Sequence, residues 1–136
     1  LNMITSAIAN KGKLVEPYLL KSVKNNYGAV IKEFSSSGTS QFMSEEEAAI
    51  LVGLMEEVVQ KGTATKLLDK GYTAAGKTGS AEYNSNRDSH AWFTGFAPVD
   101  DPQICVTVII ETAGSGGDYA VPMARRVFDA YFDKNN

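Results

Sequence analysis

The chain has 136 residues, 43% of them hydrophobic, which is enough for one compact core and too little for two comfortable domains. Thirteen basic and sixteen acidic residues give a net charge of −3, and no block of lysine or arginine could neutralise a run of phosphates, which argues against nucleic-acid binding. The longest apolar run, residues 104–110, is far shorter than the roughly twenty residues needed to cross a bilayer.

The first third of the chain predicts a helix followed by a β-hairpin. Apolar side chains among the first eight residues follow helical spacing, and Gly12 supplies a stop signal. Because this helix is already under way at Leu1, we expect the chain to be part of a longer protein, with any signal peptide or membrane anchor left out. Two apolar runs then flank a turn-rich group at 25–28, which predicts a hairpin over residues 18–34.

A helix is predicted over residues 45–61. Ser44 and Glu47 have the spacing of a capping box at its start. Apolar residues then recur on one helical face, and Lys61 with Gly62 provides a favourable charge and a C-terminal glycine. The segment is therefore expected to pack one face against the core.

The second half predicts an antiparallel meander over residues 72–111. Three strand candidates, at 72–83, 91–97 and 104–111, follow one another with no room for a helix between them. The connection 84–90 is polar, and the next connection carries an Asp-Asp-Pro turn signal. Neighbouring strands are therefore expected to pair.

A terminal helix is predicted from about 120 to 132, because Pro122 suits a first helical turn and apolar residues recur on one face. That face is expected to cover the meander and to give residues 1–136 an α+β fold. The glycine-rich loop 114–117 before it is interpreted as a flexible connection. Cys105, the single cysteine, cannot close an intrachain disulfide and is predicted to pack as a small hydrophobe.

The chemically suggestive stretch is 71–80, which reads GYTAAGKTGS and matches two unrelated templates. As G-x-x-x-x-G-K-T it fits the phosphate-binding loop, in which backbone amides and a helix N-terminus hold phosphates and Lys77 pairs with them. Such a loop must open a helix, whereas Gly79 and a polar loop follow here. Nucleotide binding therefore lacks its structural context and is kept as an alternative function.

The second template is Lys-Thr-Gly on a strand, here at 77–79, a motif of the serine enzymes that react with penicillins. Its surroundings strengthen it, since 75–82 reads AGKTGSAE and 90–98 reads HAWFTGFAP. With the Gly-Thr-Ala at 62–64, these segments resemble the C-terminal part of a penicillin-binding protein transpeptidase domain, particularly of the monofunctional, class B-like kind. The related serine β-lactamases and β-lactam sensors share the motif and remain alternatives.

The resemblance implies a peptidoglycan D,D-transpeptidase that cross-links stem peptides through a serine acyl-enzyme and is acylated by β-lactams. It makes Lys77 catalytic, as a positive charge beside the substrate carboxylate that also orients a hydroxyl of the second motif. Thr78 and Ser80 offer hydroxyls to the carboxylate, the Ser80 amide is one of two oxyanion donors, and Gly79 lets substrate backbone approach closely. Strict pleating puts Lys77 on the face opposite Thr78 and Ser80, so convergence requires the lysine to reach around.

The resemblance also implies a location on the extracytoplasmic face of the bacterial cell membrane, with the anchoring segment outside this chain. Stem peptides and β-lactams are the implied ligands, and no cofactor is implied. No metal is expected either, because a single histidine, His90, gives no metal-binding set. Exposed sheet edges and apolar faces lead us to expect self-association.

Two of the three motifs of this family are absent from the chain. No serine lies three residues before a lysine, and none lies two residues before an asparagine. Because nucleophile, base and oxyanion groups act as a unit, the chain alone is expected to show no turnover.

Several of these residues have simpler interpretations. Lys77 can be a solvated charge that discourages sheet-to-sheet pairing at an edge, in which case a non-catalytic interaction module is the alternative function. His90 is interpreted as a residue that helps to start its strand rather than as a general base. Trp92 and Phe96 share one face of that strand and Phe93 lies on the other, so these aromatic residues are predicted to be core rather than a binding platform.

Overall fold

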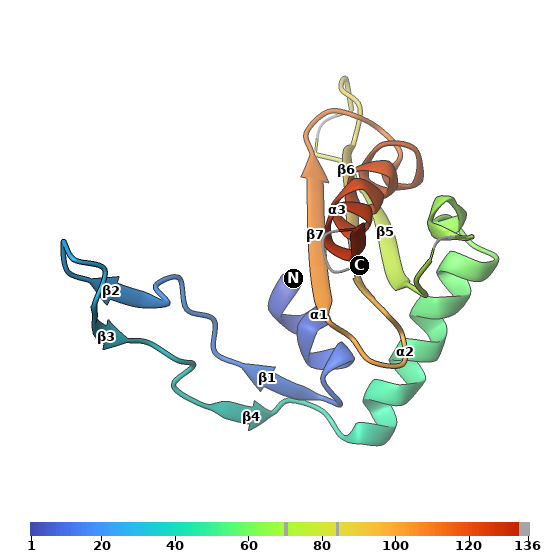
Figure 1. Cartoon of the computed structure of the whole chain (residues 1–136). Helices are drawn as coiled ribbons and strands as arrows, with labels where there is room; N and C mark the ends of the chain where they lie inside the picture. The colour runs from blue at the N-terminus through green and yellow to red at the C-terminus, as the bar shows by residue number, and fades with distance from the viewer. Residues whose placement is uncertain (70, 84, 134–136) are drawn as a thin grey trace.

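A three-stranded antiparallel sheet lies at the centre of the fold and confirms the predicted meander (Figure 1). Its strands stand in the order β5 (Ala75–Ala81), β6 (His90–Ala97) and β7 (Ile104–Ile110), so each connection joins neighbours. The structure is a computed structural model whose described part comprises three ranges: 1–69, 71–83 and 85–133. Asn84, the first residue of the predicted connection, and the last three residues of the predicted domain lie outside it.

Helices cover both faces of this sheet and bury the central strand on its two sides. Phe93 is fully buried in a cluster with the C-terminal helix α3 (Val121–Asp133), to which Phe128 belongs. Phe96 is fully buried in a second cluster, together with the N-terminal helix α1 (Asn2–Ala9). This arrangement confirms the α+β class and the prediction that both phenylalanines are core.

The helix α2 (Glu45–Gln60) begins at the predicted capping box. The Ser44 hydroxyl accepts a hydrogen bond from the Glu47 amide at 3.2 Å, and the Glu47 carboxylate accepts one from the Ser44 amide at 2.8 Å. The amide and the hydroxyl of Ser44 both donate to the Glu47 carboxylate, which favours its charged form and lowers the pKa of Glu47. The helix ends one residue before the predicted limit, with Lys61 at its C-cap, and a short 3-10 turn, η1 (Thr65–Leu67), follows.

A chain of buried and half-buried hydroxyl groups holds α1 to the sheet. Thr5, which is 2% exposed, shares a hydrogen bond of 2.7 Å with the Thr94 hydroxyl, and Thr94 shares one of 2.8 Å with Thr107. The Thr107 hydroxyl and the Cys105 thiol both donate to the side-chain oxygen of Asn2. Burial raises the pKa of the Cys105 thiol to about 11, so the thiol is protonated at neutral pH and takes part in this network as a donor.

Between α1 and α2, the chain forms an antiparallel arm that extends away from the rest of the molecule (Figure 1). Its outer part pairs β2 (Ser22–Lys24) with β3 (Val30–Glu33), which corresponds to the predicted hairpin with shorter strands. Its inner part pairs β1 (Lys13–Val15) with β4 (Thr39–Gln41), a pairing that the sequence does not predict. Large apolar side chains remain exposed along the arm: Leu19, Leu20, Tyr27, Val30 and Ile31.

Candidate active site

The four predicted site residues lie on β5, an edge strand of the sheet. Lys77, Thr78, Gly79 and Ser80 pair in register with residues 91–94 of β6. In the described part of the chain, no strand pairs with the other edge of β5. Lys77 and Ser80 are exposed and Thr78 and Gly79 are half-buried, so the motif is accessible along its free edge.

The Lys77 side chain turns back onto its own strand. The pleat directs its side chain to one face of the sheet and those of Thr78 and Ser80 to the other. Its ammonium nevertheless donates a hydrogen bond of 2.7 Å to the main-chain carbonyl of Thr78. The positive charge of Lys77 therefore lies against the backbone of Thr78, on the same strand as the two motif hydroxyls.

The phosphate-loop interpretation of the same residues is wrong. Lys77 and Thr78 lie in the interior of a seven-residue strand that continues to Ala81. A phosphate loop needs the lysine at the start of a helix, where free backbone amides point at the anion. In the described structure the next helical segment begins only at Gly116, so these residues are not at a helix N-terminus.

Thr63 brings a third hydroxyl to the site from the turn that follows α2. Its Oγ1 shares a short hydrogen bond with Thr78 Oγ1, across fifteen positions of sequence. The turn is tight because a Cβ on Gly62 would lie 2.9 Å from the Val58 carbonyl oxygen, and the Gly62 and Ala64 amides both donate to that oxygen at 3.1 Å. The Gly-Thr-Ala segment is part of the sequence resemblance, but nothing in the sequence indicates this contact.

Gly116 brings a backbone amide to the site from the other side. It begins the helical turn η2 (Gly116–Ala120), and its amide donates to Ser80 Oγ at 3.4 Å. A Cβ on Gly116 would lie 2.5 Å from the Gly79 carbonyl oxygen, and one on Gly117 would lie 2.6 Å from the Thr63 carbonyl oxygen. The second half of the loop that was interpreted as a flexible connection is therefore packed against β5 and the Thr63 turn.

An ion pair joins the two turns beside the motif. Lys66 of η1 and Asp118 of η2 lie 2.8 Å apart, measured from Nζ to Oδ1. The hydrogen bond from the Lys66 ammonium lowers the pKa of Asp118. Arg125 of α3 adds a hydrogen bond of 3.5 Å to the Lys66 carbonyl, so three elements meet at this corner. Sequence reasoning missed this pair, whose members are 52 positions apart.

His90 has the structural role that the sequence indicates. Its Nδ1 accepts a hydrogen bond of 3.0 Å from the Thr112 amide, and its ring stacks on Tyr83 with centroids 4.2 Å apart. These contacts hold the start of β6 against the end of β7. Within the described ranges, no three His, Cys, Asp or Glu side chains form a group that could hold a metal ion.

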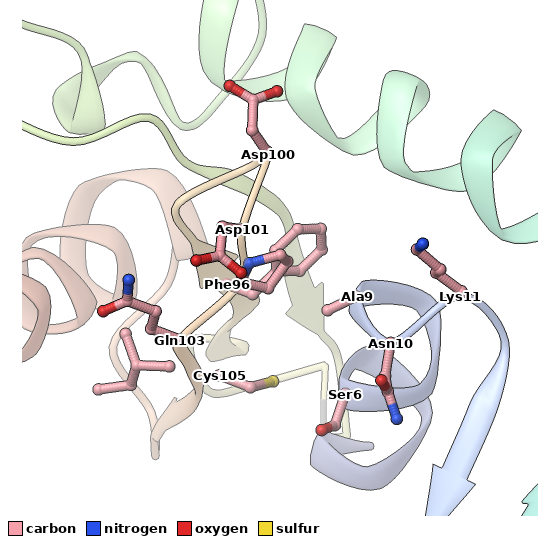
Figure 2. A pocket seen from close by; sticks show the side chains of 11 residues that line it. Ser6, Ala9, Asn10, Lys11, Phe96, Asp100, Asp101, Gln103 and Cys105 are labelled. Carbon is pink, nitrogen blue, oxygen red and sulfur yellow. The ribbon is translucent and has the colours of Figure 1, made fainter.

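A cleft of about 460 Å³ lies where the end of α1 meets the turn between β6 and β7. Figure 2 shows Phe96 and Cys105 in its wall, with Ser6 and Asn10 on the side of α1. In the register of the sheet, Phe96 pairs with the first residue of β5, whereas Ser80 lies near the last. The cleft is therefore at the other end of the strand from the motif hydroxyls and is not part of their site.

Comparisons with known proteins agree on one family. The sequence model described as the penicillin binding protein transpeptidase domain matches residues 2–129. Among curated proteins, peptidoglycan D,D-transpeptidase MrdA of Haemophilus influenzae is 33% identical over 150 residues, which cover 96% of this chain and 23% of that protein. PbpA of Mycolicibacterium smegmatis, also called a peptidoglycan D,D-transpeptidase, is 34% identical over 93% of this chain and 27% of that protein.

Solved structures give the same result. The D,D-transpeptidase domain of a peptidoglycan glycosyltransferase from Eggerthella lenta has a TM-score of 0.87 and 33% identity, covering 99% of this chain and 31% of that one. Penicillin-binding protein A from M. tuberculosis, solved as a ceftriaxone acyl-enzyme complex, has a TM-score of 0.87 and 32% identity over 95% of this chain and 31% of that one. This chain thus spans about a quarter of the length of the curated relatives it matches.

Proposed function

This chain belongs to the penicillin-binding protein transpeptidase domain family, and we propose that it is the C-terminal portion of a peptidoglycan D,D-transpeptidase. The observation that carries the proposal is the Lys-Thr-Gly-Ser motif at 77–80, displayed on the accessible edge strand β5. The relatives with this name are matched over nearly the whole of this chain. Their names favour a transpeptidase over the serine β-lactamases and β-lactam sensors that share the motif.

The proposed reaction is acyl transfer through a serine that lies outside these residues. The serine oxygen forms an ester with the penultimate D-alanine carbonyl of a stem peptide, and the terminal D-alanine leaves with the proton. The amine of a second stem peptide then attacks the ester, forms the cross-link and returns the proton to the serine. A β-lactam enters the same first step, but its amide nitrogen stays tethered after the ring opens, so the ester persists.

The residues of β5 supply binding and electrostatic groups for this reaction. Lys77 places a positive charge beside the substrate carboxylate and toward the hydroxyl of the missing second motif. Thr78 and Ser80 present hydroxyls to the carboxylate from one face of the strand, and the Ser80 amide serves as an oxyanion donor. Gly79 leaves room for the ligand, because it has no side chain on the intervening position.

The proposed place of action is the extracytoplasmic face of the bacterial membrane, where peptidoglycan is cross-linked. Of the helices in residues 1–69, 71–83 and 85–133, none has both the length and the hydropathy to span a membrane. The anchoring segment outside this chain is part of the proposal and comes from the family resemblance.

Residues 1–136 and the whole protein should react differently with labelled penicillin. The chain contains no serine three residues before a lysine, so incubation of residues 1–136 with the label should give no added acyl mass in intact-mass spectrometry. The whole protein should gain one acyl group, on a serine outside these residues. A stoichiometric adduct on any serine of this chain, or none on the whole protein, would contradict the proposal.

Self-association of residues 1–136 is expected from the apolar surface that the fold leaves open. On the arm, Leu19 is 101% and Ile31 67% exposed; on α2, Ile50 is 64% and Leu54 60% exposed. Exposed apolar side chains of this kind favour association with another chain. In sedimentation velocity, the weight-average sedimentation coefficient should rise with protein concentration. A single monomer boundary at every concentration would contradict this prediction.

A further inference from the structure

Each motif hydroxyl of β5 is already engaged by a neighbour from another element. Ser80 Oγ accepts from the Gly116 amide, so the direction of that hydrogen bond is fixed and the Ser80 proton is left for a ligand. Thr78 Oγ1 is bonded to Thr63 Oγ1, where either oxygen could donate. The role of Thr78 therefore depends on which of the two threonines gives its proton.

We propose that Thr63 is a positioning residue that donates its hydroxyl proton to Thr78 and thereby directs the Thr78 proton at the substrate carboxylate. A hydroxyl has one proton and two lone pairs. If Thr78 donates to an anion, its bond with Thr63 survives only when Thr63 is the donor. The resulting relay runs from Thr63 through Thr78 to the carboxylate, and hydrogen bonds in such a chain strengthen one another. This inference rests on the proposed function.

The backbone around Thr63 is built to hold that donor in place. Gly62 closes the turn against Val58, and Gly117 packs on the Thr63 carbonyl. The Lys66–Asp118 ion pair then ties the turn to η2. A threonine side chain is also restricted in χ1, so a fixed backbone leaves its hydroxyl few directions.

Packing in the core does not explain why position 63 carries a threonine, because the residue is exposed. Its side-chain hydroxyl forms a hydrogen bond with Thr78. A hydroxyl in that position has little to contribute to the core, whereas it lies one hydrogen bond away from the group proposed to bind the carboxylate. The relay therefore predicts selectivity: Thr63 should matter for ligands that carry the carboxylate and not for those in which it is esterified.

The test uses the whole protein and the second-order rate constant of acylation, with benzylpenicillin and its methyl ester as probes. Thr63→Val and Thr63→Ala should each lower the rate constant for benzylpenicillin about five- to tenfold, with the ester changed less than about twofold. Thr63→Ser, which restores the hydroxyl, should behave as wild type. Thr65→Val in the same turn is the matched control, and thermal melting checks that every variant folds.

The companion variant Thr78→Val separates this inference from the proposed function. In its background, Thr63→Val should add no further loss, because the relay has no second member. Equal losses for the acid and its ester, an unchanged rate in Thr63→Val, or additive losses in the double variant would overturn the relay while leaving the transpeptidase assignment intact. Absence of any adduct on the wild-type protein would instead overturn the proposed function and the relay with it.

Discussion

Replacing Lys77 by alanine should lower the acylation rate constant of the whole protein by benzylpenicillin about 100- to 10,000-fold. The ammonium is the one charge that the motif places against β5, where it donates to the Thr78 carbonyl. Alanine removes both the attraction for the carboxylate and the group that orients the second-motif hydroxyl. The measurement is the rate of adduct formation, followed by intact mass over time.

The fold should survive this change, because Lys77 is exposed and substitutions at such positions usually alter stability by less than about 0.5 kcal/mol. Lys61→Ala is the matched control, since that lysine is also exposed and pairs with Glu57 on the surface of α2. It should leave acylation unchanged. A Lys77→Ala protein acylated at the wild-type rate would reduce the residue to the solvated edge charge of the simpler interpretation.

Gly116→Ala should lower the free energy of unfolding by about 3 kcal/mol and impair the site as well. The added Cβ would lie 2.5 Å from the Gly79 carbonyl oxygen and close to the Trp92 carbonyl oxygen, both of which belong to paired strands. Backbone in a sheet cannot move aside as a side chain can, so η2 must shift and take its amide away from Ser80. Guanidinium unfolding followed by circular dichroism measures the first effect.

Gly53→Ala supplies the opposite control. Gly53 lies in the interior of α2, and a Cβ there would meet nothing within 4 Å. Alanine has the higher helix propensity, so this variant should gain up to about 1 kcal/mol. If Gly116→Ala gained stability as Gly53→Ala is expected to, helix propensity rather than contact with β5 would govern Gly116.

Elements with a strong local signal were predictable from the sequence. The capping box at Ser44 and the apolar periodicity after it located α2 within one residue of its end. The inner part of the arm was missed because β1 and β4 are three residues long and lie 24 or more positions apart, from Val15 to Thr39. Strands that short carry too little alternation to be told from loops, and only the folded chain brings them together.

The candidate site likewise has a part that the sequence predicts and a part that only the tertiary structure shows. The Lys-Thr-Gly motif and its strand are contiguous in sequence, so the sequence alone is enough to predict them. Thr63, Gly116 and Asp118 enter from turns that are joined to their partners only by the tertiary fold. Glycine at 116 also looks the same in a sequence whether it serves flexibility or close packing, and only the neighbouring Gly79 backbone shows which applies.

The hydroxyl chain beneath α1 sets the position at which that helix can dock. Eight residues are too few for a helix that is stable in water, so α1 is ordered by what it lies on. An apolar contact tolerates sliding, but a slide by one turn, about 5.4 Å, would break the hydrogen bonds from Thr5 to Thr94 and from Thr107 to Asn2. Each lost hydrogen bond costs roughly 0.5–1.5 kcal/mol. These side-chain hydrogen bonds therefore fix the position of α1 along the sheet, where apolar packing alone would allow a range of positions.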